Sequence, residues 1–165
     1  MSPPFDVSRY QDPLGIQRVL HNAKTIAIVG LSKNELRASY FVGYYLKRHG
    51  YRVIPVNPAY PQILGETCYP SLLEVPERVD VVDVFRKPED VPPIVDDAIR
   101  IGAKVLWLQI GVIHEAAEQR AREAGLEVVA NRCMKIEHAR LFGGLGFFGV
   151  YTGVISSKRP RWLPF

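Results

Sequence analysis

A glycine that ends an apolar, β-rich run is the clearest chemical feature of the sequence. The run covers residues 25–29, and Gly30 follows it directly. Because Gly30 has no side chain, backbone N–H groups beside it can approach a phosphate closely. The N-terminus of a helix after the turn would add its dipole and its unpaired donors. The loop at Gly30, Leu31, Ser32 and Asn34 is therefore a predicted phosphate-binding site.

This loop departs from the signature of a dinucleotide site. NAD-binding folds carry G-x-G-x-x-G and an acidic residue after the second strand. Here residues 31–35 contain no glycine, and the second β-rich run ends at Asn57 and Pro58. Lys33 and Arg37 instead place cationic side chains on the loop, which favours a ligand with more phosphate charge. An NAD(P)-linked oxidoreductase remains the alternative.

Cys133 follows the last β-rich run, so it is expected at the same edge of the sheet as the phosphate loop. Arg132 or Lys135 could activate the thiol of Cys133 as a thiolate, which would attack a thioester. The other interpretation is a small buried cysteine. The histidines are isolated in sequence and suggest neither a metal site nor a catalytic pair, so we assign no catalytic residue and no metal ligand.

The elements that would position these residues alternate between strands and helices, which predicts parallel strands joined by right-handed crossovers. Ser39 is the expected N-cap of the second helix and is also a candidate cofactor-binding residue, and Asp12 is the expected N-cap of the first helix. A short helix is expected at 71–75, within a proline-rich segment. The expected strands are 25–29, 52–56, 79–85, 104–108 and 128–130, and the expected longer helices are 13–22, 39–48, 89–101 and 114–123.

These elements predict an α/β, Rossmann-like, doubly wound and mainly parallel five-stranded sheet with helices on both faces. Its expected strand order is 3-2-1-4-5, which puts the ligand between strands one and four. The loops at 30–37 and 109–113 would form the walls of the site. The pairs Asn57 and Pro58, and Phe85 and Arg86, would close its edge.

Length and composition are those of one ordinary globular domain, expected over residues 1–165. Its core is expected at about 11–141, followed by a glycine- and aromatic-rich tail at 142–165. The net charge of +4 is spread along the sequence, so a nucleic-acid partner is not expected. The two cysteines lack metal or disulfide spacing. Glycines interrupt the apolar stretch at 141–155, so no membrane span is expected, and without a secretory signal the expected location is the cytoplasm.

Four segments together resemble the stand-alone CoA-binding domain family, which is similar to the N-terminal Rossmann domain of succinyl-CoA ligase alpha subunits. The segments are 26–32, 53–58 (Val-Ile-Pro-Val-Asn-Pro), 79–86 (Val-Asp-Val-Val-Asp-Val-Phe-Arg) and 131–138 (Asn-Arg-Cys-Met-Lys-Ile-Glu-His). The resemblance runs from about residue 11 to 141. It implies a protein that binds CoA or acyl-CoA without the ligase's catalytic domain.

The resemblance also implies where the cofactor lies. The diphosphate would bind at 30–34, residues 58–60 would lie near the nucleotide, and Phe85, Arg86, Gln109 and Ile110 would line the cofactor. Tyr60 departs from the ligases, which carry a phosphate-binding lysine near this position. A homo-oligomer or an acyltransferase is a possible partner, and a CoA-dependent enzyme that uses Cys133 stays open beside the NAD(P) alternative.

Overall fold

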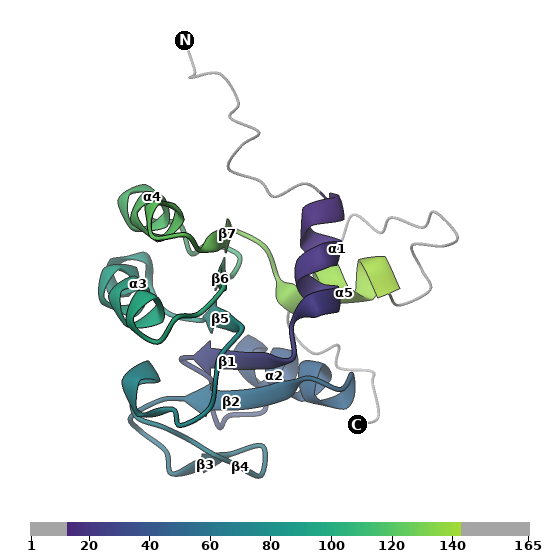
Figure 1. Ribbon diagram of the computed structural model, residues 1–165. Coiled ribbons are helices and arrows are strands. Elements are labelled where there is room, and N and C mark those ends of the chain that lie inside the picture. Colours follow the sequence, from purple (N-terminus) through teal and green to yellow (C-terminus); the bar gives the residue numbers. More distant parts are fainter. Residues whose placement is uncertain (1–12, 143–165) are drawn as a thin grey trace.

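The computed structural model describes residues 13–142, and its centre is a five-stranded parallel sheet (Figure 1). The strands are β1 (Thr25–Val29), β2 (Arg52–Val56), β5 (Val81–Val84), β6 (Val105–Leu108) and β7 (Glu127–Val129). They pair in the order β2-β1-β5-β6-β7. The predicted α/β, Rossmann-like class is confirmed.

The predicted strand order was wrong. The third strand of the sheet in sequence, β5, pairs with β1 on one side and β6 on the other, instead of lying outside β2. In strand numbers the order is 2-1-3-4-5, the other common doubly wound order. Both orders satisfy right-handed crossovers, so the alternation of elements does not separate them. The point where strand order reverses therefore lies between β1 and β5, which brings Gly30 next to Phe85.

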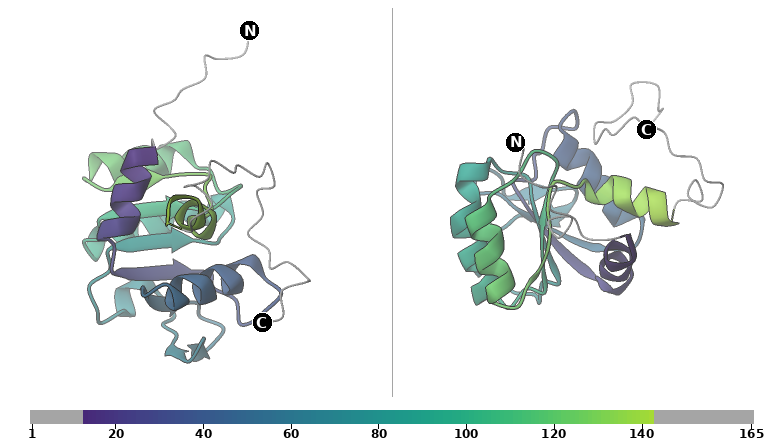
Figure 2. Two further views of the ribbon diagram at one scale, coloured as in Figure 1. Left: turned by 90° about the vertical axis from the view of Figure 1, so that its right-hand side faces the viewer. Right: turned by 90° about the horizontal axis from the view of Figure 1, so that it is seen from above.

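Helices cover both faces of the sheet, as predicted (Figure 2). Alternate residues of each strand face opposite layers. Ile26 and Ile28 of β1 pack toward one set of helices, while Ala27 and Val29 pack toward the other. The first set is α1 (Pro13–Asn22), α2 (Ala38–Arg48) and α5 (Met134–Phe142), and the second is α3 (Val91–Arg100) and α4 (Glu115–Glu123). Because both faces are buried, the central strands are almost continuously apolar.

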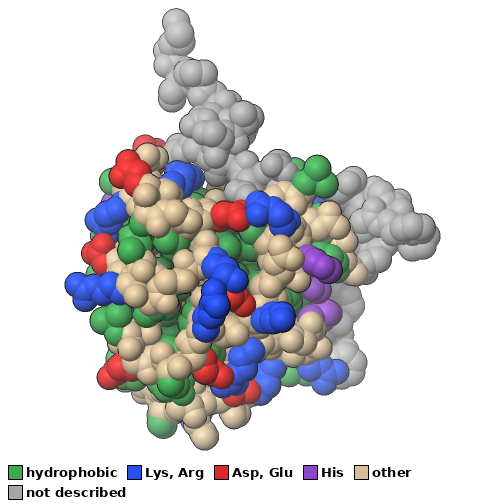
Figure 3. All heavy atoms as spheres, in the orientation of Figure 1, with side chains coloured by type: hydrophobic (Ala, Val, Ile, Leu, Met, Phe, Trp, Pro, Cys, Tyr) green, Lys and Arg blue, Asp and Glu red, His purple; other side chains and the backbone are tan. Residues whose placement is uncertain are grey.

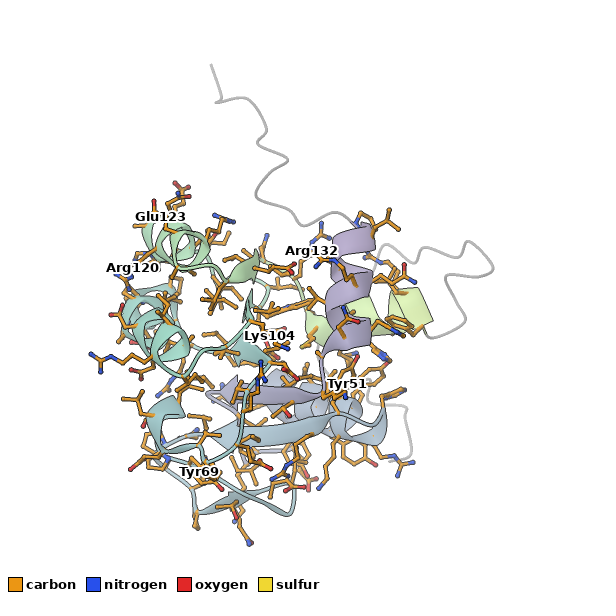
Figure 4. The ribbon with its side chains drawn as sticks, viewed as in Figure 1. Tyr51, Tyr69, Lys104, Arg120, Glu123 and Arg132 are labelled. Atoms are coloured by element: carbon orange, nitrogen blue, oxygen red, sulfur yellow. The ribbon has the colours of Figure 1, made fainter. Side chains whose placement is uncertain are left out.

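The two helices of the second set are tied to each other at the surface. Arg120, labelled in Figure 4, donates to the backbone oxygen of Pro92 at 2.8 Å and forms an ion pair with Asp96 at 3.0 Å. Pro92 and Pro93 lie in the first turn of α3, where no intrahelical N–H is lost, as predicted. A short 3₁₀ turn, η3 (Pro88–Asp90), precedes this helix.

The segment between β2 and β5 holds a hairpin that sequence reasoning missed. Its strands are β3 (Gln62–Ile63) and β4 (Glu66–Thr67), and both turn residues, Leu64 and Gly65, have positive φ. Tyr69 then runs beside Val56 and extends the sheet edge (Figure 4). The expected short helix at 71–75 is the 3₁₀ helix η2 (Leu72–Glu74).

Several boundaries differ from prediction. The helix α2 begins at Ala38, with Arg37 at its N-cap position, so Ser39 is not the cap. The helix α5 was not predicted. The expected cap Asp12 and the tail beyond Phe142 lie outside the described residues.

Acidic and basic side chains are intermingled on the face toward the viewer in Figure 3, and histidines lie at its right-hand edge. Lys104 forms an ion pair with Asp80 at 3.5 Å, and Arg52 forms one with Glu77 at 3.0 Å. Within residues 13–142, each helix is too short or too polar to cross a membrane.

Candidate functional site

The glycine turn brings the carboxyl ends of β1 and β5 into direct contact. Gly30 has a φ of +87°, and its N–H donates to the backbone oxygen of Val56 at 2.9 Å. A Cβ on this residue would lie 2.4 Å from the backbone oxygen of Phe85. Real Cβ atoms do not come so close to backbone, so only glycine fits here.

The side chains after the turn build the loop itself. The N–H of Ser32 donates to Oγ of Ser39 at 3.0 Å, and the N–H of Asn34 donates to Oγ of Ser32 at 3.0 Å. Asn34 in turn accepts from the N–H of Leu36 through Oδ1 at 2.9 Å. Short polar side chains often stabilise turns in this way. Ser32, Asn34 and Ser39 therefore shape the phosphate loop, and their side-chain oxygens are already engaged.

Two backbone donors remain on the same loop. Within residues 13–142, the N–H groups of Lys33 and Glu35, both exposed residues, have no hydrogen-bond partner. The first turn of α2 adds the unpaired donors that begin every helix. The side chains of Lys33 and Arg37 are exposed beside these groups. The arrangement can hold an anion of more than one negative charge.

Asn57 fixes the loop after β2 against the glycine turn. Its Nδ2 donates to the backbone oxygen of Leu31 at 3.0 Å, and its Oδ1 accepts from the N–H of Ala59 at 2.9 Å. The amide thus positions the phosphate loop. Pro58 is exposed, and Tyr60 is half-buried against the core beside the hairpin.

A hollow of about 450 Å³ lies beyond the turn, at the ends of β5 and β6. Four predicted site residues line it together: Phe85, Arg86, Gln109 and Ile110. Ala38, the first residue of α2 and the one that follows the loop at 30–37 in sequence, also lines it. Asn57, Pro58 and Tyr60 lie outside this lining, on the β2 side of the glycine turn. The strand order explains this division, since β1 separates β2 from β5.

A buried carboxyl that sequence reasoning missed lies beneath this hollow. Asp83 of β5 is fully buried, and its Oδ1 accepts from Nε2 of Gln109 at 2.6 Å. Its Oδ2 has no hydrogen-bond partner within the described residues. Burial raises the pKa of Asp83 to about 7, against the lowering effect of the Gln109 hydrogen bond. The sequence does contain a signal for this buried group, because Asp83 is an acidic residue within the otherwise apolar run 81–84.

The thiol of Cys133 lies near Asp83 and is buried, with 1% of its surface exposed. Burial raises the pKa of this thiol to about 11, and the charge of Asp83 adds to the effect. The two predicted activators do not outweigh the effect of burial. Lys135 lowers the pKa of the Cys133 thiol less than burial raises it, and Arg132 (Figure 4) forms an ion pair with Glu137 at 3.7 Å. The environment therefore favours a neutral thiol, as in a structural cysteine.

This environment predicts slow chemical labelling of Cys133. The Cys68→Ala variant leaves Cys133 as its one cysteine. An aromatic disulfide reagent should react with this variant about 100-fold more slowly when it is folded than when it is in denaturant. The reason is that the thiolate population falls tenfold for each unit by which the thiol pKa rises. Equal rates in the two states would show an accessible thiolate and would restore Cys133 as a candidate nucleophile.

Three of the four histidines make contacts within the fold. His114 caps α4, where its Nδ1 accepts from the N–H of Ala117 at 3.2 Å. His49 and His138, distant in sequence, meet with ring centroids 5.1 Å apart, and Nδ1 of His138 lies 3.0 Å from the hydroxyl of Tyr45. In the part of the chain that the structure describes, no group of three or more His, Cys, Asp or Glu side chains is arranged to hold a metal ion.

Comparison with known proteins gives close matches in sequence and in fold. The chain is 37% identical over 124 residues to the uncharacterised protein YneT of Bacillus subtilis. This alignment covers 75% of this chain and 92% of YneT. A hypothetical protein from Pyrococcus horikoshii OT3 has a solved structure with a TM-score of 0.80 and 43% identity, over 87% of this chain and 99% of that one.

A more distant match is to a much larger enzyme. The acetate–CoA ligase (ADP-forming) of Methanocaldococcus jannaschii is 32% identical over 81 residues, which are 49% of this chain and 12% of the ligase. The profile of the family described as "CoA binding domain" matches residues 24–139, from the start of β1 to within α5. The match thus includes the glycine turn, the loop after β2 and both walls of the hollow. The chain belongs to the CoA binding domain family.

Proposed function

We propose that this protein binds coenzyme A across the carboxyl edge of its sheet, with the diphosphate on the loop at 30–37. The observation that carries the proposal is the unpaired N–H groups of two exposed residues, Lys33 and Glu35, close in sequence to a glycine whose position is fixed by Phe85. Anions bind readily to such backbone donors at the start of a helix. Lys33 and Arg37 match the additional charge of a diphosphate.

The hollow beside Phe85 suits the pantetheine arm. Its lining combines the Phe85 ring and Ile110 with the amide of Gln109, and the arm itself alternates methylene groups with amides. Apolar walls with a few polar groups are typical of cofactor sites. Arg86 lies at the same hollow and is exposed.

Binding without chemistry on this chain is the favoured role. The one candidate nucleophile, Cys133, is buried with a raised thiol pKa. An NAD(P)-linked oxidoreductase has less support, because the side chain after β2 is the amide of Asn57, which is already bonded to Leu31 and Ala59. A binding protein of this kind would present CoA or acyl-CoA to a second protein, such as an acyltransferase or another copy of the chain.

Calorimetric titration of the nucleotide-free protein tests this proposal. CoA should bind, while NAD and NADP should not compete with it at matched salt. Lys33→Gln should weaken CoA binding by about 3- to 10-fold, because it removes one cation from the diphosphate. The control is Arg78→Gln, an exposed cation just before the opposite end of β5, which should bind as wild type does. Folded protein without affinity for CoA would contradict the proposal.

A further inference from the structure

A hollow of about 480 Å³ lies at the amino end of the sheet, opposite the proposed cofactor site. Lys24, which precedes β1, and Arg52, the first residue of β2, both line it. Since β1 and β2 are parallel, both strands begin at this edge and end at the edge that carries the glycine turn. Tyr51 also lines the hollow and marks its place below α1 in Figure 4. A ligand in this hollow would therefore bind apart from CoA.

Three helices each contribute one histidine to the lining of this hollow. His21 lies in the last turn of α1, His49 directly follows α2, and His138 lies on α5. The rings of His49 and His138 have centroids 5.1 Å apart and planes inclined at 64°. Two imidazoles that bind one tetrahedral Zn²⁺ through Nε2 at about 2.0–2.1 Å have ring centres about 5 Å apart. The pair therefore has the spacing of two ligands of one ion.

One residue, Tyr45, contacts both rings at their Nδ1 atoms. Nδ1 of His49 lies 2.8 Å from the backbone oxygen of Tyr45, which can only accept, so Nδ1 carries the proton and Nε2 of the neutral ring has a free lone pair. Nδ1 of His138 lies 3.0 Å from the hydroxyl of Tyr45, and when it donates to that hydroxyl its Nε2 is free as well. Within residues 13–142, neither Nε2 atom has a hydrogen-bond partner. Histidines that bind metals are commonly oriented in this way, through a hydrogen bond from the other ring nitrogen.

The surroundings favour the neutral form of this pair, which is the form that binds a metal ion. Burial lowers the pKa of His138, and the neighbouring His49 lowers it further, because two imidazolium charges so close together would repel each other. Burial also raises the pKa of Tyr45 to about 12, so its hydroxyl keeps its proton and remains available to His138. Proton loss from the rings would therefore not limit metal binding at neutral pH.

The rest of the lining selects the kind of ion. In the described part of the chain no carboxylate lines this hollow, so Mg²⁺ or Ca²⁺ would lack the oxygen ligands that they need. Imidazole nitrogens prefer Zn²⁺, Ni²⁺ and Cu²⁺. The charge of Arg52 is balanced by ion pairs with Glu66 and Glu77, and Lys24 is exposed, so water and salt screen its charge.

We propose that His49 and His138 form a binding site for a divalent late transition metal such as Zn²⁺. Within residues 13–142 no three His, Cys, Asp or Glu side chains are arranged to hold an ion, so the site consists of two imidazoles with water at the remaining positions. His21, on the same hollow, is the nearest source of a third ligand in the lining. A bound ion would tie the end of α2 to α5.

Calorimetric titration of the untagged full-length chain with ZnCl₂ near neutral pH tests this site. The wild type should bind one equivalent, and His49→Gln and His138→Gln should each weaken Zn²⁺ binding by at least about 10-fold, because each removes one of two protein ligands. His114→Asn is the matched control, since this histidine caps α4 and asparagine is also a good cap, so its Zn²⁺ affinity should equal that of the wild type. Circular dichroism checks that each variant is folded.

Two further measurements separate ligation from a structural effect. Tyr45→Phe keeps the ring but removes the hydroxyl beside His138, and it should weaken Zn²⁺ binding by about 10-fold. With Cu²⁺ as the probe, pulsed electron paramagnetic resonance should detect two imidazoles in the wild type and one in His49→Gln or His138→Gln. Zn²⁺ should also raise the melting temperature of the wild type but not that of His49→Gln, since only a ligand that binds the native state stabilises it.

The inference fails if the folded wild type binds Zn²⁺ no better than His49→Gln does, or if its Cu²⁺ spectrum shows a single imidazole. Neither result bears on the proposed binding of CoA, because the substituted residues lie outside the lining of the cofactor hollow. Titration of the same variants with CoA tests that function separately, and each should bind CoA as the wild type does.

Discussion

Replacing Gly30 with alanine should lower the free energy of unfolding by about 2–4 kcal/mol and abolish CoA binding. Two costs add at this position. The backbone has a φ of +87°, which an L side chain rarely adopts, and the new Cβ would lie 2.4 Å from the backbone oxygen of Phe85. The clash is with backbone, so it can be relieved only by moving β1 away from β5. That movement would distort the loop donors on which the diphosphate is proposed to bind.

A second glycine separates the two costs. Gly125, after α4, has a φ of +93°, and a Cβ there would meet nothing within 4 Å. Gly125→Ala should therefore show the conformational cost alone, about 1 kcal/mol, with CoA affinity unchanged. Urea denaturation followed by circular dichroism gives both values, and calorimetry in buffer tests binding by the folded variants. Equal destabilisation by the two substitutions would mean that the contact with Phe85 has no energetic weight.

The sequence predicts the elements of this fold well but not their order. Runs such as Thr25–Val29 and Val105–Leu108 show their type because both faces of the sheet are covered, and covered strands are uniformly apolar. The position of β5 beside β1 depends on where the segment between β2 and β5 crosses the sheet edge. No local pattern records that path, and two orders meet the same rules for crossovers.

The sequence likewise predicts one part of the candidate site, the glycine turn, but not the side-chain contacts around it. The chemistry of Gly30 follows from a strand that ends at glycine, because this requirement is local. The engagement of Ser32, Asn34 and Ser39 with the loop backbone is not visible in the sequence, since the same side chains could equally face a ligand. The β3–β4 hairpin depends on a turn with positive φ at Leu64, a conformation that leucine seldom adopts, so the sequence gives no sign of it.

Asp83 gives the second large effect, a dependence of stability on pH. In the unfolded chain this carboxyl ionises near its ordinary value of 3.8, whereas burial raises its pKa to about 7 in the folded protein. Between these values the folded state holds a proton that the unfolded state has released. The stability contributed by the protonated group is therefore fully present below pH 4 and is lost as pH rises through 7. From pH 5 to pH 8 the loss is about 2–3 kcal/mol.

Asp83→Asn mimics the protonated carboxyl and should remove this dependence. The asparagine oxygen can still accept from Gln109, so the variant and the wild type should be close in stability at pH 5. At pH 8 the variant should be more stable by about 2–3 kcal/mol, measured as the free energy of unfolding in urea at both pH values. Subtracting variant from wild type cancels the contribution of other titrating groups, such as His138, whose pKa is lowered by burial and by His49.

Asp80→Asn provides the matched control with the opposite sign. Burial acts to raise the pKa of Asp80, but the N–H groups of Lys24 and Thr25 and the ammonium of Lys104 outweigh it, so the pKa is lowered. The carboxylate is then ionised in both states above pH 5, and Asp80→Asn should destabilise equally at pH 5 and pH 8. If Asp83→Asn also shifts stability by the same amount at both values, Asp83 does not titrate in this range. If the dependence is present, ionisation of a buried carboxyl acts directly on Gln109, whose amide lines the hollow proposed for the pantetheine arm.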